Sequence, residues 1–121
     1  MTRGCRVKEA YWYLATPYSK YPKGLDAAFI EASKAAGFLV AQGFRVYSPI
    51  VHCHPIAIHS GIDPLSHEIW LAADAPFMHG AAGLIVVEMV GWKDSFGIKE
   101  EIEFFEGEGK PILRMEWNDE R

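Results

Sequence analysis

One carboxylate in the second half of the chain lies where a carboxylate is not expected. A helical stretch begins after Ser95, and its apolar side chains share one face at about 100° per residue. Glu100, Glu103 and Glu106 fall on the opposite side, but Glu101 falls inside the apolar face. A carboxylate turned toward a core is costly unless it is paired or used. Glu101 is therefore either a flanking residue that reaches water or a lysine, or a working carboxylate.

The loop before this helix has the composition of an anion site. Residues 83–87 form an apolar run typical of a buried parallel strand, and residues 91–97 follow it as a polar loop. Ser95 is the expected N-cap, and Gly97 leaves open space in the first helical turn. Free backbone N–H groups and the helix dipole point into the crevice at such a strand end. Small anionic ligands are therefore expected there.

Other polar side chains are expected at the same crevice. The end of the predicted first strand and the loop after it contain Tyr13, Thr16, Tyr18 and Ser19. Asp74 stands at the predicted start of a short helix, where it is either an N-cap or a second working carboxylate. Two carboxyl groups in one pocket suit glycosidic bond cleavage, because one stabilises or attacks the anomeric carbon while the other moves protons. Aromatic walls would suit a flat base.

Strands and helices alternate along the chain, which predicts an α/β fold. Strands are expected at residues 11–15, 44–47, 84–88 and 112–115, and helices at 24–42, 63–73, 74–79 and from 95 to 107 or 109. This order predicts one three-layer domain over residues 1–121, flavodoxin- or Rossmann-like, with a parallel sheet of four to five strands and helices on both faces. Residues 50–62 are expected to be irregular and to supply any fifth strand.

Composition restricts the class of partner. The net charge of the 121 residues is −4 with no basic run, which argues against a nucleic-acid polymer. The chain shows no signal region and no apolar stretch of about 20 residues, so no membrane association is expected. Two well-separated cysteines, Cys5 and Cys53, suit a reduced compartment. We expect a cytoplasmic protein.

Metal and thiol chemistry are not predicted. His52 and His54 would share one face of a strand, but no convincing third ligand lies near them in the sequence. His54 is assigned to the pocket lining. Cys53 has no recognisable base partner for a nucleophile. Trp92 is expected either to anchor its loop or to stack on a base, and no cofactor is predicted.

The motifs resemble those of the nucleoside 2-deoxyribosyltransferase superfamily, and the resemblance covers most of the chain. They are Tyr-Leu-Ala-Thr-Pro at 13–17, Ser-x-Gly-x-x-x-Glu at 95–101 and Gly-Lys-Pro-Ile at 109–112. The sequences Ser-Pro-Ile-x-His-x-His at 48–54 and Gly-Trp-x-x-Ser-x-Gly at 91–97 are similar to a small bacterial and phage branch. The spacing from the glutamate to Gly-Lys selects Glu101 over Glu100.

The resemblance implies roles for individual residues. Glu101 would be the nucleophile that forms a glycosyl-enzyme intermediate, Tyr13 would orient it, and Asp74 would contact the sugar or the base. Superfamily members that act on free nucleosides carry an aspartate where this chain has Ser95, whereas the related 2'-deoxynucleoside 5'-phosphate N-hydrolases carry a serine. A hydroxyl accepts a phosphate that an aspartate would repel. The resemblance also implies a homodimer or higher homo-oligomer.

The resulting prediction is cleavage of the N-glycosidic bond of a (deoxy)nucleoside 5'-monophosphate, by hydrolysis or by base transfer. Ser95 and Gly97 would receive the phosphate. The loop at residues 16–20 departs from those hydrolases, since it offers hydroxyls and one lysine in place of a Gly- and Arg-containing segment. Two alternatives stay open: a nucleotide-binding or regulatory module without turnover, and an enzyme that acts on another phosphosugar glycoside.

Overall fold

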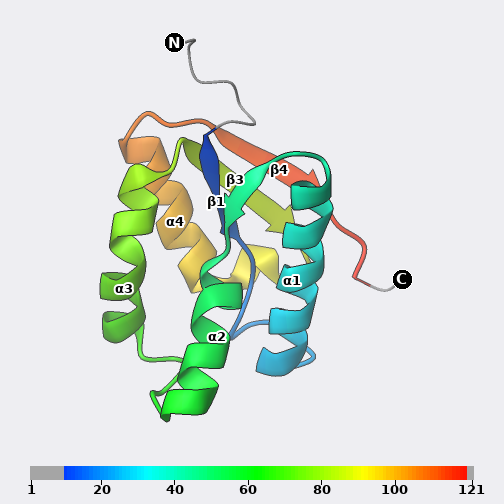
Figure 1. Cartoon of the computed structure of the whole chain (residues 1–121), viewed down its shortest axis with the longest axis vertical. Coiled ribbons are helices and arrows are strands. Elements are labelled where there is room, and N and C mark those ends of the chain that lie inside the picture. The colour runs from blue at the N-terminus through cyan, green and yellow to red at the C-terminus, as the bar shows by residue number, and fades with distance from the viewer. Residues whose placement is uncertain (1–9, 120–121) are drawn as a thin grey trace.

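A parallel sheet lies between helical layers in the computed structural model, which describes residues 10–119 (Figure 1). Its strands are β1 (Tyr11–Ala15), β2 (Arg45–Tyr47), β3 (Gly83–Glu88) and β4 (Ile112–Glu116). The strand order is β2-β1-β3-β4, and all neighbouring pairs are parallel. The predicted α/β fold is confirmed with four strands, and β1 lies between β2 and β3.

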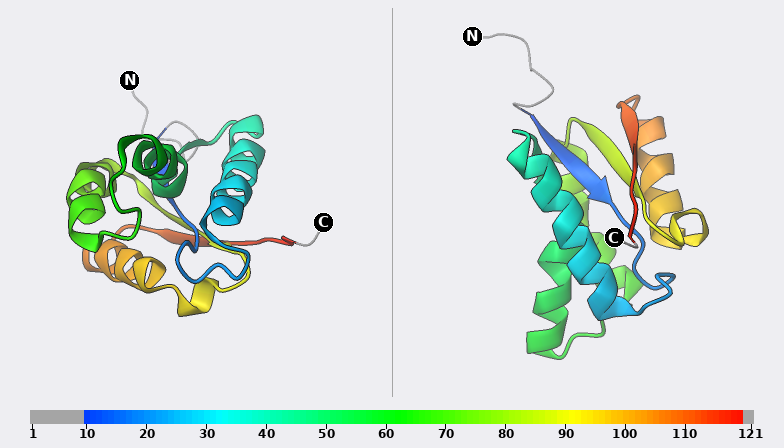
Figure 2. Two further views of the ribbon diagram at one scale, coloured as in Figure 1. Left: turned by 90° about the horizontal axis from the view of Figure 1, so that it is seen from below. Right: turned by 90° about the vertical axis from the view of Figure 1, so that its right-hand side faces the viewer.

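Helices cover both faces of this sheet. They are α1 (Leu25–Ala41), α2 (Pro49–Ser60), α3 (His67–Gly80) and α4 (Phe96–Gly107), with the short 3-10 helix η1 (Trp92–Asp94). Figure 2 shows α1 on one face and α3 with α4 on the other, while α2 extends past the carboxyl ends of the strands beside α1. Within residues 10–119, no helix combines the length and the apolar character needed to cross a membrane.

Alternation along β1 decides which side chains meet which helices. Trp12 and Leu14 belong to the core under α1, whereas Tyr13 and Ala15 belong to the core with α3 and α4. β3 alternates in the same way, so both central strands are buried on both faces and read as continuous apolar runs. Tyr13 consequently lies on the same side of the sheet as Glu101.

Residues 50–62 are not irregular, and the prediction of a possible strand there was wrong. They form most of α2, which begins at the Ser48–Pro49 pair. Ser48 caps the helix by accepting a hydrogen bond from the N–H of Val51 at 3.2 Å, and Pro49 suits the first helical position. The helix includes Pro55 and ends at Ser60, and the C-cap Gly61 has a φ of 77°. Ser48 and Pro49 therefore begin a helix directly after β2.

Residues 63–80 also differ from the prediction. Asp63 stands in a turn, where its Oδ1 accepts a hydrogen bond from the N–H of Leu65 at 2.9 Å, and α3 begins only at His67. The helix continues through Pro76 to Gly80, so the predicted break before residue 74 does not occur. One proline removes one backbone hydrogen bond, and here the turns on both sides remain helical. Asp74 therefore lies inside a helix and is not an N-cap.

Candidate active site

A cavity of about 320 Å³ lies at the carboxyl ends of the strands. Its walls come from the loop after β1, the start of α2, the helix α3 and the first turns of α4. Most of the predicted site residues line it: Tyr13, Thr16, Tyr18, Asp74, Ser95, Gly97 and Glu101. Residues from four separate parts of the chain therefore meet in a space within the range of small-ligand pockets.

Glu101 is partly buried and lines this cavity from α4. Burial and the negative charges of Asp74 and Glu100 raise the pKa of Glu101 well above its usual range, and a hydrogen bond with Tyr13 lowers it in part. No lysine or arginine among residues 10–119 forms an ion pair with it. Glu101 therefore does not neutralise a surface cation, and its carboxyl group lines the cavity.

Asp74 reaches the same cavity from α3. Its Oδ1 accepts a hydrogen bond from the Tyr47 hydroxyl at 3.1 Å and one from the Cys53 thiol at 3.4 Å. Burial raises the pKa of Asp74, while these two hydrogen bonds and the nearby His52 lower it. Because both donors use Oδ1, the carboxylate is held in one orientation, and the hydrogen bonds described for it leave Oδ2 for a ligand.

The two carboxyl groups influence each other. The charge of Asp74 is the second cause, after burial, of the raised pKa of Glu101. Two acids that share a site do not ionise independently, because each charge disfavours the other, and their pKa values belong to the pair. Such a pair offers a carboxylate and a carboxylic acid in one cavity over an interval of pH.

Tyr13 supplies the hydroxyl next to Glu101. It is only 1% exposed, and its ring packs against those of Tyr47 and Phe105 at centroid distances of 5.7 and 5.9 Å. Burial and the charges of Glu101 and Asp74 raise the pKa of Tyr13, so its phenol stays protonated and donates a hydrogen bond. Tyr13 therefore offers a hydrogen-bond donor to the Glu101 carboxyl group.

The first turn of α4 forms another wall of the cavity. Ser95 is the N-cap, and its Oγ accepts a hydrogen bond from the N–H of Ile98 at 3.2 Å. The first amides of a helix have no partner within the helix and attract anions. A Cβ at Gly97 would come no closer than 3.9 Å to Ser95 Oγ. The packing of the protein itself therefore does not require glycine there, and the open space belongs to the cavity.

Thr16 contributes a buried hydroxyl that lacks a partner. Its side chain is 5% exposed and lines the cavity, and its Oγ1 has no hydrogen-bond partner among residues 10–119. An unsatisfied buried hydroxyl is destabilising, and such groups in folded proteins call for an explanation. A polar ligand in the cavity would provide the missing partner.

His54 and Trp92 lie outside the main cavity, although both were predicted to bind substrate. His54 lines a smaller adjoining cavity of about 80 Å³ behind Tyr18. Trp92 lies in η1, where its ring contacts the cationic ends of Lys93 and Arg114 at 5.8 and 5.1 Å. It also packs against the core with α3 and α4. Of the two roles considered for Trp92, this position matches the loop anchor.

His52 and His54 of α2 do not share a face, contrary to the prediction that they lie on a strand. Residues two apart on a helix are about 200° apart, so His54 is buried while His52 is exposed. Within the part of the chain that the structure describes, no three His, Cys, Asp or Glu side chains are arranged to hold a metal ion. Burial and the charge of Asp74 raise the pKa of Cys53 to about 12, so this thiol is a donor to Asp74.

Sequence reasoning missed several residues of the site. Tyr47 stands at the carboxyl end of β2, and that position alone could have singled it out, since open α/β sheets gather ligands at this edge. Trp70 and Pro64 line both cavities but carry no motif that distinguishes them from core residues. Cys53 was considered only as a nucleophile, whereas it acts as a hydrogen-bond donor to Asp74.

Comparison with known proteins identifies one family. A family model described as a domain of unknown function (DUF1937) matches residues 10–117. This span includes every residue that lines the two cavities. No curated protein matches the chain.

Proposed function

Because the chain belongs to the DUF1937 family, whose function is unknown, we propose its activity from the cavity: it cleaves the N-glycosidic bond of a (deoxy)nucleoside 5'-monophosphate. The bond would be cleaved by hydrolysis or by transfer to a second base. The observation that carries this proposal is the meeting of Glu101 and Asp74 in one cavity that also contains the N-terminus of α4. A sugar between two carboxyl groups, with its phosphate on helix amides, uses all of these groups at once.

Glu101 is the nucleophile in this proposal. Its carboxylate attacks C1' of the sugar, the bond from C1' to the base breaks, and a glycosyl-enzyme ester forms. Water or a second base then attacks C1' and releases Glu101. The hydrogen bond with Tyr13 restricts the carboxyl rotation and so keeps one oxygen toward the cavity. Only the ionised form attacks, and the developing positive charge on the sugar favours that form.

Asp74 binds the sugar in this proposal, and Ser95, Gly97 and Thr16 bind the phosphate and its neighbouring hydroxyls. Tyr47 and Cys53 hold Oδ1 of Asp74, which leaves Oδ2 to accept a hydrogen bond from a sugar hydroxyl. The unpartnered Thr16 hydroxyl supports the binding of a polar ligand in the cavity. Ser95 adds a hydroxyl without charge at the N-terminus of α4, where a phosphate is favoured.

We also propose that the protein acts in the cytoplasm as a homodimer or higher homo-oligomer. Support for self-association comes from large apolar side chains that remain exposed on and before α3: Leu65, Ile69, Leu71 and Phe77. Leu65 and Leu71 also line the cavity, so a second copy on this surface would narrow its mouth. Equilibrium sedimentation should show a dimer, and Leu71→Glu should shift it toward the monomer.

The direct test is release of free base. The protein is incubated with a panel of ribo- and deoxyribonucleoside 5'-monophosphates, the matching nucleosides and other phosphosugar glycosides, and the products are separated by chromatography. The proposal expects base from at least one monophosphate and much less from its nucleoside. Binding of monophosphates in calorimetry without base release from any compound would instead identify a nucleotide-binding module. Activity confined to another phosphosugar glycoside would keep the nucleophile but change the substrate.

A further inference from the structure

Three side chains from three elements connect the cavity to the protein surface. The Tyr18 hydroxyl, in the loop after β1, lies 2.5 Å from Nδ1 of His54 on α2. Nε2 of His54 lies 2.8 Å from Oδ1 of Asp26 on α1. Tyr18 lines the main cavity, His54 is 5% exposed, and the Asp26 side chain is 87% exposed. A buried imidazole thus joins a cavity hydroxyl to a carboxylate in water.

The neighbours of His54 hold its ring in one orientation. Phe29 stacks on the ring at a centroid distance of 4.8 Å, and Tyr18 meets it edge-on at 5.7 Å. An ionised carboxylate only accepts hydrogen bonds, so Nε2 carries the proton shared with Asp26. Nδ1 then accepts from Tyr18 when the ring is neutral and donates to Tyr18 when the ring is protonated. The protonation state of His54 therefore decides whether Tyr18 offers the cavity a lone pair or a proton.

The environment of Tyr18 suits a proton donor to a flat base. Burial, with the charges of Asp26 and Cys53, raises the pKa of Tyr18 to about 12, so its hydroxyl keeps its proton at neutral pH. Ile50, Pro64 and Trp70 line both cavities next to it and provide apolar walls. Besides Tyr18 and His54, the titratable groups that line the small cavity are Cys53 of α2 and Asp74 of α3.

On the basis of the function proposed above, we propose that Tyr18, His54 and Asp26 form a proton relay that protonates the departing base. Tyr18 is the catalytic acid, because it lines the cavity in which the substrate would bind. His54 and Asp26 are positioning residues that act through it. The relay differs from the carboxyl pair, which acts on the sugar, and it gives the motif histidine at position 54 a role although it lies outside the main cavity.

The first half of the reaction begins with a protonated His54 and an ionised Glu101. The glutamate oxygen bonds to C1', and the electron pair of the bond from C1' to the base remains on the base nitrogen. Tyr18 gives its proton to that nitrogen and takes the Nδ1 proton of His54 in return. The free base leaves neutral, and His54 is left neutral with Nε2–H donated to Asp26.

The second half restores every group. Water attacks C1', and the bond from C1' to the glutamate oxygen breaks with its electron pair returning to Glu101. The water proton passes to the Tyr18 oxygen while the Tyr18 proton passes to Nδ1 of His54. Over both halves one water is consumed: its hydroxyl ends on C1' of the sugar, and its proton replaces the one that left with the base. Asp26, which is in contact with solvent, remains the hydrogen-bond acceptor of Nε2 of His54 in both halves.

The test compares two leaving groups. One substrate is the nucleoside 5'-monophosphate that the wild type cleaves fastest, and the other is a 4-nitrophenyl 2-deoxyriboside 5-phosphate, whose nitrophenolate leaves without a proton. Tyr18→Phe should lower base release by about 10²- to 10⁴-fold, the usual contribution of a general acid, and leave nitrophenol release near the wild-type rate. Tyr21→Phe is the matched control, since its hydroxyl bonds Asp119 and does not line the cavity.

The positioning residues give an independent readout. His54→Gln should show the same selective loss of base release, and Asp26→Asn a smaller one. Replacement of the buried His54 could destabilise the protein, whereas Asp26 is exposed and its replacement should leave the fold intact. Thermal melting of each variant checks the folded state.

The outcomes separate the relay from the N-glycosidase activity. Selective loss of base release in the Tyr18 and Asp26 variants supports the relay. Equal loss of base and nitrophenol release in the variants, or no loss of either, overturns the relay. The proposed N-glycosidase activity still stands in that case if the wild type releases base. A wild type that releases neither base nor nitrophenol overturns both proposals.

Discussion

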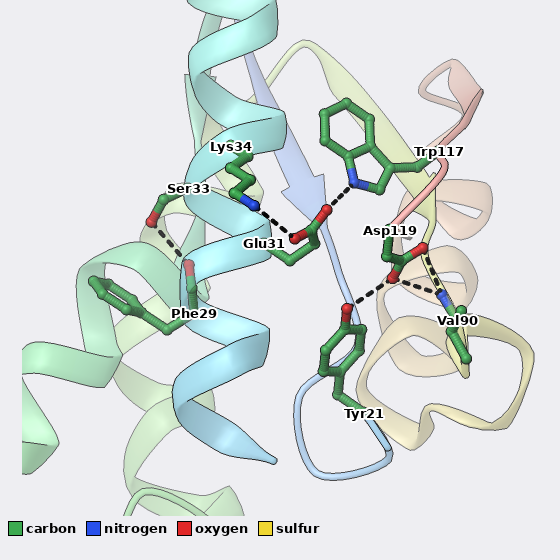
Figure 3. A network of polar contacts seen from close by, with 8 residues as sticks. All are labelled: Tyr21, Phe29, Glu31, Ser33, Lys34, Val90, Trp117 and Asp119. Carbon is green, nitrogen blue, oxygen red and sulfur yellow. Dashed lines mark hydrogen bonds and ion pairs between the residues drawn. The ribbon is translucent and has the colours of Figure 1, made fainter. Parts of the chain in front are cut away.

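Glu31 and Glu101 are both acids on inward faces of helices, yet their surroundings differ. Glu31 of α1 is 8% exposed, and its Oε2 accepts a hydrogen bond from Nε1 of Trp117 at 2.6 Å. Its Oε1 forms an ion pair with Nζ of Lys34 at a distance of 3.5 Å. Figure 3 shows both partners of Glu31. Glu101 has a hydrogen bond with Tyr13 but no cation among residues 10–119, and it faces the cavity. The first acid is satisfied by the fold and the second is not.

The same contrast extends to the neighbouring acids. Asp119 uses both of its oxygens: Oδ2 accepts a hydrogen bond from the Tyr21 hydroxyl at 2.8 Å, and the N–H of Val90 donates to Oδ2 at 3.1 Å and to Oδ1 at 3.4 Å (Figure 3). Asp74 has two donors as well, but both use one oxygen. A buried acid with complete partners stabilises a fold, whereas an incompletely paired acid beside a hollow costs stability and marks a functional site.

The largest expected difference between the two glutamates is in activity. Glu101→Gln should lower base release by at least about 10³-fold, because an amide cannot form the glycosyl ester. Glu31→Gln is the matched control and should keep near-wild-type activity, since Glu31 lies on the opposite face of the sheet. Chromatographic assays of the two variants measure this. Similar activities of the two variants would contradict the assignment of Glu101.

The acid limb of the pH profile should be displaced upward. Because the pKa of Glu101 is raised and only its ionised form attacks, kcat/KM should rise with pH through that raised value, above the pH at which an ordinary glutamate ionises. Initial rates over a range of pH measure this, with melting curves at each pH to confirm folding. If kcat/KM is already independent of pH near the usual glutamate pKa, the assignment of a buried Glu101 as nucleophile would be contradicted.

Stability should change in opposite directions in the two variants. Glu31→Gln should lower the free energy of unfolding by about 1 kcal/mol, because a hydrogen bond to a charged acceptor becomes a neutral one. At low pH, Glu101 is protonated in both the folded and the unfolded state, and Glu101→Gln should have the same free energy of unfolding as the wild type. As the pH rises through the raised pKa of Glu101, the folded wild type has to ionise a buried acid and its free energy of unfolding falls. The variant has no such group and should become the more stable protein. Urea unfolding at two pH values measures both changes, and equal shifts would contradict the comparison.

The smallest expected effect concerns the glycine of the anion wall. Gly97→Ala should leave the melting temperature within a few degrees of the wild type, because the added methyl group meets no protein atom closer than 3.9 Å. It should raise KM for a monophosphate several-fold and leave KM for a nucleoside unchanged, since the methyl group occupies space beside the helix amides. Gly107→Ala on the same helix, with nothing within 4 Å, is the control. Equal changes of KM for both substrates would contradict the binding of the phosphate at the first turn of α4.

Local patterns were enough to predict much of the fold and part of the site. The apolar runs of β1 and β3, the cap at Ser95 and the inward phase of Glu101 are all confirmed, because each depends on residues close in the chain. Local patterns failed at residues 49–60, where two prolines obscured a helix, and around Asp74, where Pro76 suggested a break that packing does not allow.

The sequence by itself determined the parallel α/β architecture and the inward orientation of Glu101, since periodicity and capping act over a few residues. Only the tertiary structure decided the partners of each polar group. Tyr47 and Cys53 reach Asp74 across 27 and 21 residues, and Tyr18 reaches His54 across 36. Such pairs depend on how whole helices pack against the sheet, and no local pattern carries that information.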